Sequence, residues 1–148
     1  MGAVPRDVAV VAATDARGRV LLVQQRAGPF EGAWLLPGGG VHAGEPPLAA
    51  ARREVSEETG CLLRGAREVA AYRVRSGGAA WTVRVFRGTV AGVPRPEEGS
   101  AVRWGDPGAA GWHPSLRVEL AGAGLRREDG AALAAALGRV GIAMDRLR

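Results

Sequence analysis

The chain has 148 residues, of which 47% are hydrophobic and 24% charged, and it carries a formal net charge of +5. This length and composition are typical of one globular domain with its own core, so we expect a single domain over residues 1–148. No apolar run is long enough for a membrane span, and the single cysteine excludes an internal disulfide framework. The N-terminus lacks the pattern of a secretory signal, so we expect a cytoplasmic protein with no membrane partner.

The basic charge comes from arginine alone, since the 20 residues counted as Lys or Arg include no lysine. Such a charge could attract phosphorylated ligands or nucleic acid. The arginines are spread along the chain and accompany many alanines and glycines, which favours coding bias as the explanation. An arginine that faces a ligand would still suit a phosphate, because its guanidinium forms paired hydrogen bonds.

Two segments near the N-terminus have the apolar character of β-strands. Residues 7–14 and 19–25 are separated by a turn at 15–18, so they predict a β-hairpin. A loop over residues 26–32 follows, and three consecutive glycines occupy positions 38–40.

The segment after the glycines predicts one helix with an acidic face. Two prolines suit its first turn, and Gly60 suits the position after its last turn. Glu54, Glu57 and Glu58 stand at i, i+3 and i+4, so they share one face of the helix. Their mutual repulsion destabilises the helix, and Glu57 and Glu58 also lie near its negative end. A divalent cation that prefers oxygen ligands would offset this repulsion, so the pattern predicts a metal site.

The same segment matches a family motif at every fixed position. The motif is Gly, five residues, Glu, seven residues, Arg-Glu, an apolar residue, any residue, Glu-Glu, any residue, Gly and an apolar residue. In this chain the positions are Gly39, Glu45, Arg53, Glu54, Val55, Glu57, Glu58, Gly60 and Cys61. This segment resembles the Nudix hydrolase family. Cys61 is a small departure, because the family more often has a branched aliphatic residue there, but a buried cysteine also behaves as a small hydrophobe.

The rest of the chain predicts further strands and a second helix. The expected elements are an extended segment at 62–75, a turn at 76–78, strands at 81–90 and 101–104, and an alanine-rich helix at 129–137. Residues 105–125 and the last ten residues give no clear assignment. The resemblance implies the Nudix fold, an α/β/α sandwich with a central mixed sheet, and this order of elements is compatible with it.

The resemblance also implies a metal site on the acidic face. Glu54, Glu57 and Glu58 would hold Mg²⁺ or Mn²⁺, and the carbonyl of Gly39 is a further candidate ligand, because glycine permits an unusual backbone path. Such an ion polarises a phosphoryl oxygen and lowers the pKa of a bound water.

Arg53 is expected to support the ligands rather than bind the metal. By pairing with a carboxylate such as Glu45, it would fix the loop against the helix and orient the ligands. The alternative is an exposed pair with Glu57, which would contribute little.

The general base has two candidate locations. One is a glutamate of the helix, Glu57 or Glu58; the other is a glutamate on a distant loop, as in many members of the family. Glu98 comes shortly before a strand that ends in Trp104, a pattern similar to the family's loop acid, so Glu98 is our choice and Glu97 the second. Two solvated loop acids are the alternative.

Residues outside the helix are needed to hold the substrate. We assign Arg26 to a phosphate contact and Gly38 and Gly39 to substrate binding. The aromatic candidates for base stacking, each more often a core residue, are Trp34, Tyr72, Trp81 and Trp104.

The leading hypothesis is a Mg²⁺- or Mn²⁺-dependent pyrophosphohydrolase that cleaves the diphosphate of a nucleoside diphosphate linked to another group. One alternative is an RNA 5′-end pyrophosphohydrolase, although no basic stripe with interleaved aromatics marks a polynucleotide groove. Another is a catalytically silent Nudix domain that senses a nucleotide, but silent relatives usually lose a glutamate and this chain keeps all of them. The expected partner is a small nucleotide, and a homodimer is an open alternative because many relatives form one.

Overall fold

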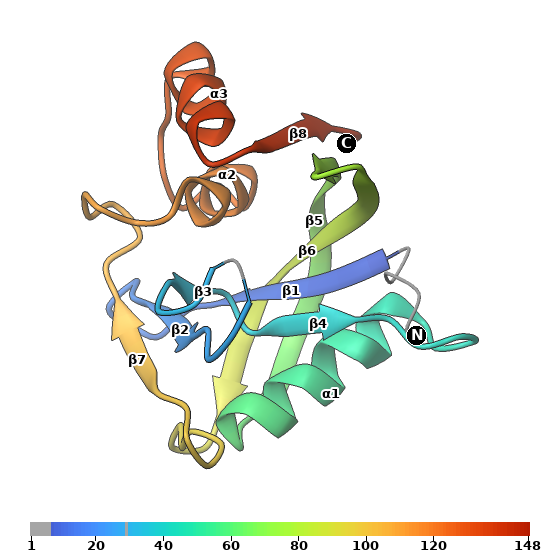
Figure 1. Ribbon diagram of the computed structural model, residues 1–148. Coiled ribbons are helices and arrows are strands. Elements are labelled where there is room, and N and C mark those ends of the chain that lie inside the picture. The colour runs from blue at the N-terminus through green and yellow to red at the C-terminus, as the bar shows by residue number, and fades with distance from the viewer. Residues whose placement is uncertain (1–6, 29) are drawn as a thin grey trace.

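The computed structural model describes residues 7–28 and 30–148. Figure 1 shows the elements in chain order: β1 (Asp7–Ala13), β2 (Val20–Gln24), β3 (Trp34–Leu35), β4 (Gly38–Gly40), α1 (Pro47–Thr59), β5 (Leu62–Ser76), β6 (Ala79–Ala91), β7 (Val102–Gly105), α2 (Pro114–Gly122), α3 (Gly130–Arg139) and β8 (Ile142–Arg146). The predicted helices and long strands are confirmed, and α2 and β8 fall in the two stretches that the sequence left unassigned. In the described part of the chain, no helix is both long and apolar enough to cross a membrane.

The central sheet has five strands in the order β4-β1-β6-β5-β8. β1 runs parallel to β6, and all other neighbours are antiparallel, so the sheet is mixed. The three glycines at 38–40, which carry no strand-forming side chain, form β4 at one edge. A Cβ at Gly38 would collide with the carbonyl oxygen of Ala9, so only glycine allows β4 to lie this close to β1.

The predicted hairpin of residues 7–14 and 19–25 is wrong in its pairing. Its turn is present, with a hydrogen bond from the Asp15 amide to the Arg19 carbonyl at 3.0 Å and one bridge between Thr14 and Val20. Beyond it, β2 joins a second, three-stranded sheet between β3 and β7. The physical reason is that β6 pairs with the whole of β1 on one edge, while β4 pairs with Val8, Ala9 and Val10 on the other and the Val11 amide donates to the Pro37 carbonyl, so little of either edge is left for β2.

β1 separates two hydrophobic cores, because its side chains alternate between the two faces of the sheet. Ala9, Val11 and Ala13 pack in the core that includes Val55 of α1. Val10 and Ala12 pack in the other core, which includes buried side chains of α2 and α3. Figure 1 shows α1 below the sheet strands, with α2 and α3 above. This is the α/β/α sandwich that the sequence predicted.

Candidate active site

Helix α1 and strand β4 hold the acidic face against the glycines. A Cβ at Gly39 would lie 2.5 Å from Oε1 and 2.7 Å from Cδ of Glu54. No side chain therefore fits at position 39, and glycine lets the Glu54 carboxylate lie directly on the backbone of β4. Helix α1 ends at Thr59, and the next residue, Gly60, has a left-handed φ of 69° and an amide that donates to the Ser56 carbonyl at 2.9 Å.

Arg53 joins the loop, the strand and the helix. Its Nε and Nη2 donate to the two carboxylate oxygens of Glu45 at 2.9 and 3.0 Å, and Nη2 also donates to the Gly40 carbonyl at 3.0 Å. Its Nη1 donates to Oε1 of Glu54 at 2.8 Å. The paired hydrogen bonds from Arg53 lower the pKa of Glu45 to about 2 and raise the pKa of Arg53 above its ordinary value. The arginine therefore stays charged and fixes the orientation of Glu54.

Glu58 faces the protein interior beside Glu54. One of its oxygens accepts a hydrogen bond from the amide of Gly38 at 3.0 Å. Burial raises the pKa of Glu58 well above its usual value, and the neighbouring side chain of Glu54 raises it further, while the Gly38 amide opposes the shift. Two carboxylates this close cannot both be charged at low cost unless a positive charge lies beside them.

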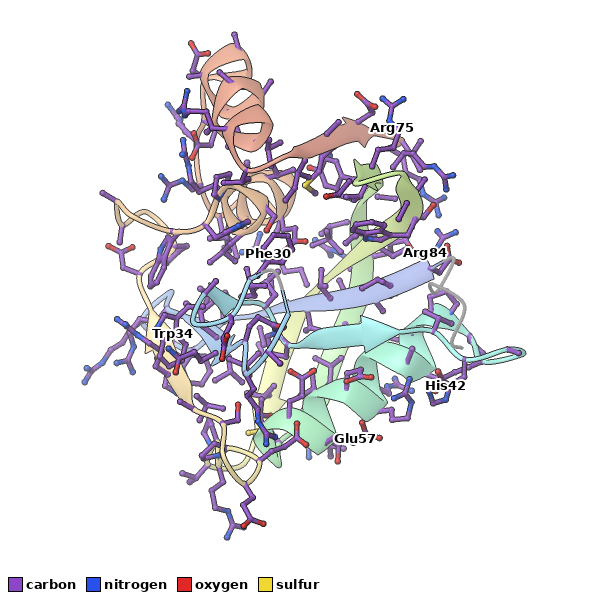
Figure 2. All side chains as sticks on the ribbon, in the orientation of Figure 1. Phe30, Trp34, His42, Glu57, Arg75 and Arg84 are labelled. Atoms are coloured by element: carbon purple, nitrogen blue, oxygen red, sulfur yellow. The ribbon has the colours of Figure 1, made fainter. Side chains whose placement is uncertain are left out.

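Glu57 is the most solvent-exposed of the three acids, with 54% of its side chain accessible, and its Oε2 lies 3.5 Å from Nη1 of Arg53. In Figure 2 it projects from the lower edge of α1. Within residues 7–28 and 30–148, no three His, Cys, Asp or Glu side chains form a closed metal-binding cluster. The structure thus brings Glu54 and Glu58 together and leaves Glu57 beside them, near the same arginine.

The donor set nevertheless fits Mg²⁺ or Mn²⁺. It offers only oxygen ligands, and the repulsion between Glu54 and Glu58 is of the kind that a bound cation relieves. The carbonyl of Gly39 belongs to the same strand against which Glu54 lies.

The loop before β7 approaches the same acids. The negative charge of Glu97 contributes to the raised pKa of Glu58, after the larger effects of burial and of Glu54. Arg26 lies against this loop, since a Cβ at Gly99 would be 2.9 Å from its Nη2. Glu97 is therefore close enough to Glu58 for its charge to act on that carboxyl.

The aromatic candidates occupy different places. Tyr72 and Trp104 belong to the two cores on either side of the sheet. Trp34 lies against the guanidinium of Arg103, 5.3 Å from the ring centre. Trp81 packs against the same core as Tyr72 and, of these four candidates, is the one that lines the cavity beside the glycines, a position suited to base stacking.

That cavity has a volume of about 210 Å³ and reaches Gly38 and Gly39. Its walls are mostly apolar, and the polar side chains on them are Gln25, Ser115 and Glu119. Glu119 is only 7% exposed, and burial raises the pKa of its carboxyl to about 8.

Sequence reasoning missed Glu119 because residues 105–125 gave no clear assignment. A signal was present nonetheless: Leu116, Glu119, Leu120 and Ala123 stand at i, i+3, i+4 and i+7, the spacing of a buried helix face. An acid on such a face is unusual, because carboxylates are rarely buried without a partner.

The family model of the Nudix domain matches residues 4–123. The chain belongs to the Nudix family. A crystal structure titled as a MutT Nudix hydrolase from Burkholderia pseudomallei superposes with a TM-score of 0.72 and 28% identity, over 80% of this chain and 98% of that one. The Nudix resemblance and the fold class predicted from the sequence are thereby confirmed.

Two curated Nudix relatives carry different substrate names. An ADP-ribose pyrophosphatase of Bacillus subtilis is 36% identical over 83 residues, which are 55% of this chain and 44% of that protein. An 8-oxo-dGDP phosphatase of Mus musculus is 34% identical over 105 residues, which are 68% of this chain and 29% of that protein. The chain thus spans less than half the length of these relatives. Members of the Nudix family act on small nucleotide substrates and generally use divalent metal ions such as Mg²⁺.

Proposed function

We propose that this Nudix protein is a Mg²⁺- or Mn²⁺-dependent pyrophosphohydrolase that cleaves the diphosphate of a nucleoside diphosphate linked to another group. The observation that carries the proposal is the contact of Glu54 with Gly39 and Arg53, next to the partly buried Glu58. Glu54, Glu57, Glu58 and the Gly39 carbonyl would hold the ion. When bound, such an ion polarises phosphoryl oxygens and lowers the pKa of a coordinated water.

The remaining residues have separate roles in the proposal. Arg53 positions Glu54 through its paired contact with Glu45 and its contact with the Gly40 carbonyl. Arg26, on the loop side of the site, would contact a phosphate of the substrate.

The general base is either a glutamate of helix α1 or a glutamate of the loop before β7. The effect of Glu97 on the pKa of Glu58 supports Glu97 as the loop candidate, with Glu98 beside it. Turnover of Glu97→Gln and Glu98→Gln would assign the role: a loss confined to one variant identifies the loop base, and no loss in either returns the role to the helix.

The names of the relatives support cleavage of a phosphoric anhydride bond, while they disagree on the substrate. The test is a panel of nucleoside triphosphates, nucleotide sugars, ADP-ribose and triphosphorylated RNA, each incubated with Mg²⁺ or Mn²⁺. Identification of the products in ¹⁸O-labelled water shows which bond breaks. Preference for the RNA, with a steep loss of affinity in salt, would establish the RNA alternative instead.

Glu57→Gln and Glu58→Gln should reduce turnover by orders of magnitude without unfolding the protein. Asp145→Asn is the matched carboxyl-to-amide control, because Asp145, on β8, takes part in an exposed ion pair with Arg75 of β5. Full turnover in both glutamate variants would discard the metal assignment. If the protein binds compounds of the panel but turns none of them over, the alternative of a catalytically silent nucleotide sensor is favoured.

A further inference from the structure

Glu119 is a buried acid that the fold itself does not use. It lies on α2 between Val118 and Leu120, which are both buried. Burial alone accounts for its raised pKa, and in the described part of the chain no hydrogen bond or ion pair to its carboxyl offsets that burial. A leucine would suit this position better if packing were its purpose. Among the described residues, Nε of Arg84 is the fully enclosed side-chain polar atom without a partner, so the carboxyl of Glu119 keeps a little accessible surface, and the surface that Glu119 lines is the wall of a cavity. A largely buried acid that faces a cavity and has no protein partner calls for an explanation, and a ligand is one.

The cavity that Glu119 lines connects it to the proposed reaction centre. The same cavity reaches Gly38, whose amide contacts Glu58, and Gly39, on which Glu54 lies. A ligand that enters the cavity can therefore place its other end at the acidic face of α1.

The size of the cavity limits what it accepts. Its volume of about 210 Å³ exceeds the roughly 150 Å³ of an engineered apolar cavity that binds benzene. It is smaller than the roughly 300–1,000 Å³ of pockets that enclose a whole drug-sized ligand. It is thus suited to one planar ring system, with the rest of the ligand outside.

The walls also suit a flat aromatic ligand. Trp81 and Phe30 both line the cavity. Phe30 packs on His113 with ring centres 4.6 Å apart, which holds its ring next to the start of α2. Phe30 belongs to the segment before β3, and Figure 2 shows it just below α2. Aromatic faces of this kind stack on nucleobases.

We propose that Glu119 selects the nucleobase of the substrate, by hydrogen bonding to the edge of a base seated in this cavity. The proposal rests on the proposed function for the identity of the ligand, and it adds a specificity residue to that site. In its neutral form, a carboxyl presents an O–H donor beside a carbonyl acceptor. Its complement is a base edge with an acceptor beside an N–H donor, as on the amino-substituted ring of adenine.

The experiment measures binding without metal, so that it does not depend on turnover. Nucleoside monophosphates that differ only in the base are titrated in EDTA, by calorimetry, into wild type, Glu119→Gln and Glu119→Leu. An amide keeps a donor beside an acceptor, whereas leucine keeps only the shape. Asp145→Asn is the control, and an analogue of the preferred nucleotide that lacks the hydrogen-bonding substituent of the base completes a double-mutant cycle.

For the preferred base, we expect Glu119→Leu to weaken binding by roughly 10- to 100-fold, while Glu119→Gln stays within about threefold of wild type. The truncated analogue should bind wild type and Glu119→Leu equally. Equal affinities and an unchanged order of bases in all variants would overturn the proposal. If base binding depends on Glu119 but nothing in the hydrolysis panel turns over, the proposed function fails and this inference stands.

Discussion

Replacement of Glu119 by glutamine should stabilise the protein, and the gain should increase with pH. The pKa of the carboxyl is raised from 4.5 to about 8 by burial, so the folded chain holds a proton that the unfolded chain releases above pH 4.5. A raised acid pKa gives stability below the ordinary pKa that is lost as pH rises toward the folded value. Between pH 4.5 and about 8, wild type therefore loses stability that the uncharged Gln variant keeps.

The magnitude follows from the distance between the working pH and the ordinary pKa. At pH 7 that distance is 7 − 4.5 = 2.5 units, so protonation of Glu119 on folding costs about 3 kcal/mol, and at pH 5 the cost falls to about 1 kcal/mol. The difference in unfolding free energy between Glu119→Gln and wild type should thus increase by about 2 kcal/mol from pH 5 to pH 7.

Urea unfolding followed by circular dichroism at pH 5, 6, 7 and 8 measures this difference directly. Every other titrating group is common to both proteins, so its contribution cancels in the comparison. Asp145→Asn should follow wild type at all four values. A constant difference between Glu119→Gln and wild type across this range would refute the reasoning, because it would mean that Glu119 is ionised in the folded chain.

Three further predictions concern the acidic face and the C-terminal half. Gly39→Ala should displace Glu54 and weaken Mn²⁺ binding by about tenfold or more. Gly130→Ala is the control, because an added Cβ there meets nothing within 4 Å, and its Mn²⁺ affinity should stay that of wild type. Equal Mn²⁺ affinities of the two variants would contradict the prediction. Arg53→Lys should lower kcat by roughly 10- to 100-fold with little change in thermal stability, because an ammonium cannot reproduce the forked contact; an unaltered kcat would leave the arginine with a structural role only. Arg117 and Arg126 lower the pKa of Glu128 to about 2, so the Glu128 carboxylate stabilises the fold above pH 4.5 and loses this effect as pH falls toward 2. The urea midpoints of wild type and Glu128→Gln should therefore differ at pH 7 and converge near pH 2. A difference in midpoint that does not change with pH would count against the ion pairs.

Much of the reaction centre could be predicted because its signals are local. The positions of Glu54, Glu57 and Glu58 on one face follow from helical periodicity, and the end of α1 follows from Gly60. These features depend on residues a few positions apart, so they need no knowledge of the tertiary structure. The complete motif then allowed the family and the fold class to be inferred, and both are confirmed. The roles of the site residues remain predictions for the experiments above.

Contacts between distant segments were decided only by the tertiary structure. The sequence could not show that β2 leaves β1 for a second sheet, because that depends on the edges which β4 and β6 already occupy. It could not place Glu97 near Glu58, since a loop acid has no periodicity that indicates its direction. Nor could it show that Glu119 lines a cavity next to Gly38, because a buried face becomes a pocket wall only through the elements packed against it. Helical spacing orders neighbours along one element, whereas cavities arise between elements.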